Sequence, residues 1–140
     1  MENVIKKSVS ALIMKSVYIE NMHFKRRALV VSYENTDMDV QRTVERLEDG
    51  SFKVTLTMTI EDKQEDFVLG VTVCGIFTLE DESDETIKKA IIAKNTVAIL
   101  FPYLRSQITL LTSQPDMKPI VLPAVNINSL LENMEDSVRV

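Results

Sequence analysis

Strict alternation of apolar and polar residues is the most regular pattern in the chain, over residues 51–61. The apolar positions there are Phe52, Val54, Leu56, Met58 and Ile60. A period of two with many β-branched residues predicts a β-strand that buries one face. The pair Asp49-Gly50 comes just before it and is a strong hairpin-turn signal.

Three neighbouring segments predict the rest of a sheet. Residues 38–47 alternate and form the expected partner strand, although two arginines, Arg42 and Arg46, interrupt its apolar side. Residues 67–79 form a long strand, in which Gly70 and Gly75 mark a bend or a close approach to the backbone. Residues 8–24 form a less regular strand with apolar residues on both faces in places. Because the connections are mostly short, we expect an antiparallel sheet of four strands.

The pattern changes at residue 80, where the acidic run "EDESDE" begins. A calcium or magnesium site is one interpretation, but the spacing does not match an EF-hand loop. Acidic residues also favour the first turn of a helix, and this interpretation is stronger. The following residues carry an apolar series at helical spacing, namely Ile87, Ile91, Ala98, Phe101, Leu104, Ile108 and Leu111.

Two features are expected to interrupt this helix. Asn95-Thr96 is a candidate cap for a second helical segment. Pro102 lacks a backbone donor and should kink or restart the helix. The chain then has three prolines in a short span, which predicts an extended linker, and a short amphipathic helix from about Asn128. The sequence therefore predicts an α+β fold.

Length and composition fit one globular domain over residues 1–140, with 45% apolar and 26% charged residues. One cysteine excludes an internal disulfide and fits a reducing compartment. No run approaches the roughly 20 apolar residues that a membrane helix needs. We therefore expect a cytoplasmic protein that does not insert into membranes. The net charge of −5 argues against nucleic-acid binding, and "FKRR" at 24–27 is best explained as a solvated turn.

The residues that usually carry enzyme chemistry are scarce. His23 and Cys74 are the only histidine and cysteine, and no nucleophile motif surrounds them. Three glycines cannot build a phosphate-binding loop or a dinucleotide fingerprint, and zinc needs more ligands. We expect no enzyme activity, no cofactor and no metal. Seven methionines fit either a tightly packed monomer or a binding module with adaptable apolar grooves.

Three further segments are distinctive in their order along the chain, "CGIFTL" at 74–79, "ILFPYLR" at 99–105 and "VLPAVNI" at 121–127. Together they resemble the SecB family of protein-export chaperones. The family has similar "GGIFSI", "ILFPYAR" and "LAPVNF" segments in the same order, and the similarity covers roughly residues 9–135. Each motif alone is weak, so their order and spacing carry the resemblance.

The resemblance implies a four-stranded antiparallel sheet with a long kinked C-terminal helix and a short last helix. It implies a homotetramer built as a dimer of dimers, without cofactor or ATP use. Family members hold unfolded precursor proteins in long apolar grooves until translocation. Such a holdase gains affinity from apolar burial, and adaptable side chains let it accept many sequences.

The resemblance also assigns residues to two surfaces. The expected client-binding residues are Val40, Val44, Phe67, Phe77, Phe101, Tyr103, Leu122 and Val125. The expected subunit-interface residues are Leu69, Val71, Val73, Leu104, Ile108 and Leu111. For the client-binding residues, a plain core position or a subunit contact is the alternative.

One departure from the family concerns the translocase motor SecA, which family members bind partly through an acidic sheet face. Asn21, Lys25 and Gly70 stand where the family has acids, while Val68 keeps the aliphatic character. These replacements remove charge complementarity and should weaken SecA docking. Two functions stay open: a holdase for unfolded or precursor polypeptides, and a dedicated chaperone for one partner such as an antitoxin. An enzyme or small-ligand carrier on the same fold has no support from the residues.

Overall fold

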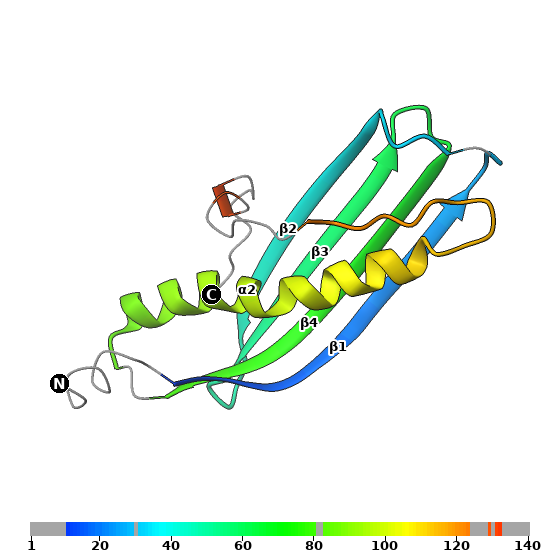
Figure 1. Ribbon diagram of the computed structural model, residues 1–140. Helices are drawn as coiled ribbons and strands as arrows, with labels where there is room; N and C mark the ends of the chain where they lie inside the picture. The colour runs from blue at the N-terminus through cyan, green and yellow to red at the C-terminus, as the bar shows by residue number, and fades with distance from the viewer. Residues whose placement is uncertain (1–10, 30, 81–82, 124–128, 130, 133–140) are drawn as a thin grey trace.

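The protein folds as one sheet with a long helix across one face, as the computed structural model shows (Figure 1). The structure describes residues 11–29, 31–80, 83–123, 129 and 131–132. The elements in chain order are β1 (Ala11–Arg26), β2 (Thr36–Arg46), β3 (Phe52–Asp62), β4 (Phe67–Glu80) and α2 (Glu85–Leu111).

The four strands form an antiparallel sheet in the order β1-β4-β3-β2, as the alternation predicts. The β2–β3 hairpin turns at Gly50, whose φ of +87° favours glycine. β1 pairs with β4 but shifts register between Met14 and Ser16 and again between Ile19 and Asn21. These irregularities move side chains from one face to the other, which explains the weak alternation of this strand.

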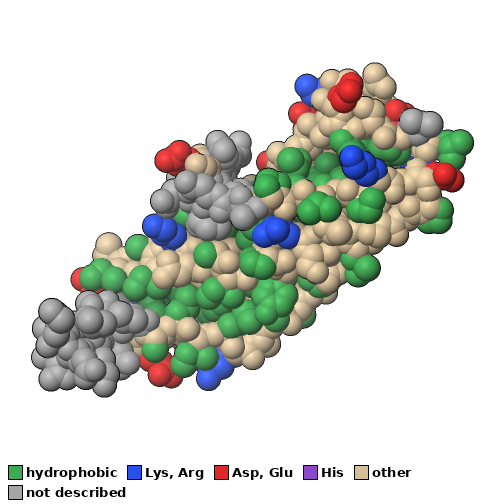
Figure 2. Space-filling model, viewed as in Figure 1, with side chains coloured by type: hydrophobic (Ala, Val, Ile, Leu, Met, Phe, Trp, Pro, Cys, Tyr) green, Lys and Arg blue, Asp and Glu red, His purple; other side chains and the backbone are tan. Residues whose placement is uncertain are grey.

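The core lies between α2 and one face of the sheet. The side chains of alternate residues of β3 and β4 point toward α2 and pack against its buried residues. Gly75 permits this contact, because a Cβ at that position would lie 2.9 Å from Leu100 Cδ2 and 2.5 Å from Phe77 Cε2. The sequence prediction of a close approach at Gly75 is therefore confirmed. Figure 2 shows apolar side chains gathered along α2 on this side of the molecule.

The acidic run that begins at residue 80 is followed by α2, as expected from the preference of acidic residues for the first turn of a helix. The carboxylate of Asp84 caps α2 by accepting hydrogen bonds from the backbone N–H groups of Thr86 and Ile87, at 2.9 and 3.3 Å. These bonds satisfy two of the donors that a helix start leaves unpaired.

The expected cap of a second helical segment at Asn95-Thr96 is wrong. Thr96 is buried inside the continuous helix, and its hydroxyl donates back to the carbonyl of Ile92. The helix also continues through Pro102, whose side chain is exposed, so it does not restart there, and a kink at Pro102 stays a prediction. Packing of the buried helix face against the sheet outweighs the capping signal at Asn95-Thr96, as tertiary contacts often do.

After α2 the chain turns at Pro115 and Asp116 and then runs without helix or strand over residues 117–123, in line with the linker that the prolines predict. The short last helix expected from about Asn128 falls mostly outside the described residues. Within the described residues, no helix has the length and apolar content that a bilayer crossing requires.

Candidate functional site

An apolar groove of about 440 Å³ opens on the helix side of the sheet, where the start of β2 meets the segment after α2. Ile60 forms its floor and is 2% exposed, whereas Met38 and Val121 at its rim are 57% and 73% exposed. The lining residues are Tyr33, Thr36, Met38, Ile60, Lys118, Pro119, Ile120 and Val121. Large apolar side chains are thus open to solvent around one hollow.

Tyr33 links the two sides of the groove, which are the β1–β2 connection and the segment after α2. Its hydroxyl donates a hydrogen bond to the carbonyl of Lys118. Its ring packs edge-on against Phe67, with 5.6 Å between the ring centroids and an interplanar angle of 84°. Burial raises the pKa of Tyr33, against the opposing effect of the Arg26 charge. The phenol therefore stays neutral and keeps its proton for this bond.

The guanidinium of Arg26 links the same two segments of the chain, the β1–β2 connection and the segment after α2, outside the groove itself. It donates to the carbonyls of Ala28 and Leu29 in the β1–β2 connection. It also donates to the carbonyls of Pro115 and Asp116 after α2, at 3.0 and 2.8 Å. Four backbone carbonyls on one charged side chain fix the spacing of the two segments.

The segment after α2 is also bonded back to the helix. The Thr109 hydroxyl donates to the carbonyl of Ile120 at 2.8 Å. The N–H of Ile120 donates to the Thr112 hydroxyl, also at 2.8 Å. Because Ile120 is held through both backbone groups, its neighbour Val121 projects from a fixed position.

The groove is suited to binding apolar side chains and has little other chemistry. Its ionisable groups are Tyr33 and Lys118. Among the described residues, no three His, Cys, Asp or Glu side chains gather as a metal site. A concave apolar surface with a few fixed polar groups is typical of a binding site.

Most client-binding residues expected from the resemblance are internal. Val44, Phe67, Phe77, Phe101 and Leu122 are buried in the core of the chain. Val40 is half-buried beside Met38 on the same side of β2, and Tyr103 is exposed on α2 at 41%. Val125 lies outside the described residues. Direct client contact by these eight side chains stays a prediction.

The expected subunit-interface residues are also mostly internal. Leu69, Val71, Val73, Leu104 and Ile108 are fully buried between the sheet and α2. Leu111 is half-buried near the end of the helix. Their role in subunit pairing stays a prediction, and within one chain they form the core.

Four groove residues are not among the site residues predicted from the sequence, namely Tyr33, Met38, Ile120 and Val121. Two signals pointed to them. Met38 is apolar at the start of a strand whose apolar side arginines interrupt further on. Ile120, Val121 and Leu122 form an apolar run between two prolines, where no regular element would bury them all.

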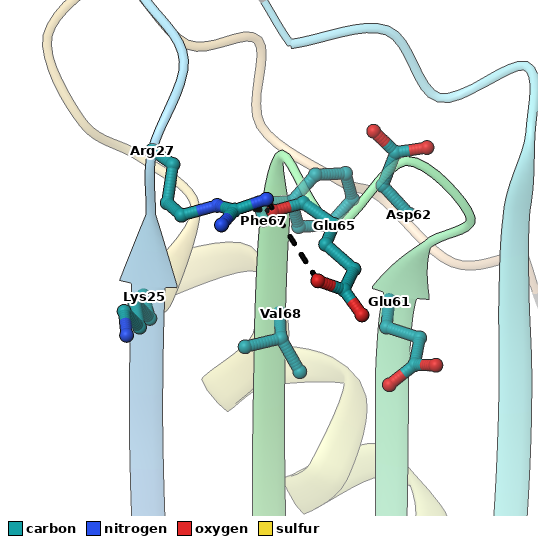
Figure 3. Close-up of a pocket in the computed structure, with 7 residues that line it drawn as sticks. All are labelled: Lys25, Arg27, Glu61, Asp62, Glu65, Phe67 and Val68. Carbon is teal, nitrogen blue, oxygen red and sulfur yellow. Dashed lines mark hydrogen bonds and ion pairs between the residues drawn. The ribbon is translucent and has the colours of Figure 1, made fainter.

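The outer face of the sheet, away from α2, carries a charged hollow of about 220 Å³ (Figure 3). Lys25 and Arg27 lie on its β1 side, and Glu61 and Glu65 lie across from them, with Val68 between. Arg27 Nη2 is 3.8 Å from Glu65 Oε2, but both side chains are exposed, so this ion pair contributes little.

The three positions that depart from the family's acids lie together on this outer face. In the register of β1 with β4, Asn21 lies opposite Thr72 and Lys25 lies opposite Val68. His23 lies opposite Gly70, between these two pairs. The face therefore presents an amide, a glycine and a cation, with no carboxylate at the three positions.

Cys74 is a buried thiol on the same face and not a reactive one. Its Sγ donates to Glu20 Oε2 at 2.9 Å and lies 3.5 Å from Thr55 Oγ1. Burial, with the Glu20 hydrogen bond, raises the pKa of Cys74. Since the thiolate is the nucleophile, a raised pKa opposes a catalytic role.

Comparisons with known proteins agree in sequence and in fold. Residues 5–137 match the family described as preprotein translocase subunit SecB. Protein-export protein SecB of Neisseria meningitidis serogroup C is 26% identical over 134 residues, covering 93% of this chain and 90% of that protein. An uncharacterized protein of Methanocaldococcus jannaschii is 29% identical over 107 residues, covering 73% of this chain and 68% of that protein.

A solved structure shares the fold. It is a SecB-like chaperone of Mycobacterium tuberculosis in complex with a ChAD peptide from the HigA1 antitoxin. The TM-score is 0.66 at 15% identity, with 81% of this chain and 90% of the other covered. The four-stranded antiparallel sheet and long helix are therefore a known arrangement.

Proposed function

The chain belongs to the SecB family, and from this premise we propose that it is an ATP-independent holdase chaperone. It binds unfolded or precursor polypeptides in the apolar groove beside β2 and keeps them unaggregated and competent for translocation. The observation that carries this proposal is the groove itself, where Met38 and Val121 stay exposed above a floor at Ile60.

The energetics of such a groove suit a holdase. Burying one large apolar side chain contributes about 1.5–3 kcal/mol, so one groove alone holds a client weakly. Methionine adapts to side chains of different shape, which favours breadth over selectivity. Several grooves in one assembly would raise the overall affinity for a long unfolded chain.

We further propose that the assembly is a homotetramer, a dimer of dimers that uses the exposed side of α2. Ile87, Tyr103 and Leu110 on this helix are 47%, 41% and 63% exposed, and Figure 2 shows the apolar surface along it. Burying such a surface between subunits removes it from water. Light scattering that gives only a monomer at micromolar concentration would contradict this.

A dedicated chaperone for one partner is the second candidate. The outer face supports it, because Lys25, Gly70 and Asn21 leave that face without the acids expected to attract SecA. The Mycobacterium tuberculosis relative in the same fold was solved with an antitoxin peptide. Binding of purified SecA at micromolar affinity would argue against this candidate, and its absence would favour it over general export.

The experiment that tests the holdase proposal is suppression of client aggregation. A chemically unfolded client is diluted into buffer without ATP, with and without the purified chain, and turbidity is followed. Stoichiometric chain should slow aggregation, because apolar client segments are covered as they appear. No suppression at several-fold excess would overturn the proposal.

A further inference from the structure

The outer face of the sheet carries opposite charges at its two margins. In one row of the register, Lys25 on β1 pairs with Val68 on β4. Val68 pairs with Glu61 on β3, and Glu61 pairs with Asp37 on β2. Residues paired in this way point their side chains to the same face of a sheet. Figure 3 shows Lys25 and Glu61 on either side of Val68. A cation therefore lies at the β1 margin, and two carboxylates lie toward the β2 margin.

The next row also ends in a carboxylate at the β2 margin. Asp39 pairs with Thr59, and Thr59 pairs with Gly70 on β4. Asp37 and Asp39 are exposed, as Lys25 is. Within the described residues, none of these three side chains forms an ion pair. Their charges are therefore left for a partner that covers this face.

The centre of the outer face carries small side chains whose polar groups are bonded to one another. Thr57 Oγ1 and Thr72 Oγ1 share a hydrogen bond of 3.1 Å. Thr55 Oγ1 lies 3.5 Å from Cys74 Sγ, within hydrogen-bonding distance for sulfur. A second surface can approach such side chains closely, and each of these hydroxyls keeps a partner when water is removed. Covering the centre of the face therefore carries a small desolvation cost.

A partner for this face needs a carboxylate over β1, a cation over β2 and small side chains between them. A second copy of this chain has that arrangement. If a two-fold axis runs along the strands between two facing sheets, β1 of each copy lies over β2 of the other. Lys25 of one copy then meets Asp37 of the other in the same row, and symmetry makes this contact twice. An axis across the strands would place β1 on β1 and lose both contacts.

We propose that the outer faces of two copies of this chain pack together in this way, with Lys25 and Asp37 as the paired contacts. The surface lies on the side of the sheet away from α2, so it is separate from the apolar groove and from the helix. The pairing goes beyond the holdase function and does not depend on it. Four strands about 4.8 Å apart and roughly 30 Å long cover about 600 Å² of each copy, near the lower limit of a specific interface. The pairing is therefore weak and reversible.

The opposite end of the outer face fits the same pairing without adding repulsion. Lys53 on β3 pairs with Ile76 on β4. The two-fold axis places β3 of one copy over β4 of the other, so Lys53 meets Ile76 and no second cation. Glu45 lies opposite Lys53 in the register and balances its charge. The charge complementarity is therefore concentrated at the Lys25 end of the face.

A charge exchange tests the pairing, with sedimentation equilibrium of the full chain as the measurement. Wild-type mass should rise with concentration, and a mass that stays constant up to about 1 mM would overturn the pairing. Lys25→Glu and Asp37→Lys each put like charges into both contacts and should weaken association about tenfold or more. An equimolar mixture of the two variants restores opposite charges in both contacts and should associate about as tightly as wild type. A mixture that associates no better than either variant alone would overturn the pairing.

Lys118→Glu is the matched control for net charge. The chain has a net charge of −5, and Lys25→Glu and Lys118→Glu make it more negative by the same amount. Lys118 lines the groove on the helix side, so its replacement should change association less than about twofold. Equal weakening by the two variants would assign the effect to net charge and overturn the pairing.

Cross-linking locates the contact. A carbodiimide joins a lysine to a carboxylate that touches it, and a mixture of light-isotope and heavy-isotope chains shows which links form between copies. Lys25 should link to Asp37 or Asp39 of the other copy. Links between copies that never include Lys25 would overturn the pairing.

Discussion

The imidazole of His23 occupies the space that a side chain at position 70 would need. A Cβ added to Gly70 would lie 2.2 Å from His23 Cε1 and 2.9 Å from Nε2. The two residues face each other across β1 and β4 on the outer face. A larger residue at position 70 therefore requires the imidazole to move away.

Replacing Gly70 by alanine tests this contact. In the His23→Ala background, Gly70→Ala should stabilise the fold by about 0.5–1 kcal/mol, because it removes a glycine from a strand interior. In the wild-type background the displaced imidazole should offset that gain. Urea unfolding of wild type, the two single variants and the double variant should give a coupling free energy of at least about 0.5 kcal/mol between the two substitutions. Strictly additive effects would show that the imidazole does not lie over Gly70.

The cap at Asp84 should matter for α2. Asp84→Ala should lower the free energy of unfolding by about 1 kcal/mol, because the N–H groups of Thr86 and Ile87 lose their acceptor. Asp84→Ser keeps a capping oxygen and serves as the matched control. Urea midpoints should place the serine variant near wild type, and equal midpoints for alanine and serine would contradict the cap.

The ion pair at the start of α2 should make stability depend on pH. The hydrogen bond from Arg46 lowers the pKa of Glu85 from its ordinary 4.5. Because the pKa of Glu85 is lower in the folded protein than in the unfolded one, the ion pair stabilises the fold above pH 4.5. This stabilisation is lost as the pH falls through the folded-state pKa. The urea midpoint difference between wild type and Arg46→Gln should therefore shrink as pH drops below 4.5. A difference that stays constant from neutral to strongly acidic pH would rule out this linkage.

Cys74 should react slowly with thiol reagents. It has no exposed surface, and burial together with Glu20 raises its pKa. At pH 8 iodoacetamide should label the folded protein about a hundredfold or more slowly than the urea-unfolded protein, since labelling needs local opening. Labelling of the folded protein at the unfolded rate would place the thiol at the surface.

Much of the fold follows from the sequence because its signals are local. The alternation from Phe52 to Ile60 and the turn at Asp49-Gly50 depend on neighbouring residues only, and both appear in β3 and its hairpin. Thr96 shows the limit of such reasoning. Its capping propensity is real, but burial of the helix face against the sheet decides its conformation.

The candidate groove was harder to predict because it joins distant segments. Met38 belongs to β2 and Val121 follows α2, and neither carries a motif that points to the other. Their spacing depends on Arg26 and Tyr33, whose bonds to backbone carbonyls are set by the fold and not by residue type. The resemblance named aromatic residues such as Phe67, which the structure places beneath the groove wall.

The most direct test of the central claim is the affinity of the chain for an unfolded client, measured by fluorescence anisotropy without ATP. Val121→Asp places a charge at the groove rim, and Leu29→Asp is its control. Leu29 is 74% exposed, against 73% for Val121, and is not a lining residue. If the client binds in the groove, Val121→Asp should weaken client binding about tenfold, and Leu29→Asp should change it less than about twofold. Equal client affinity in both variants and wild type would contradict it.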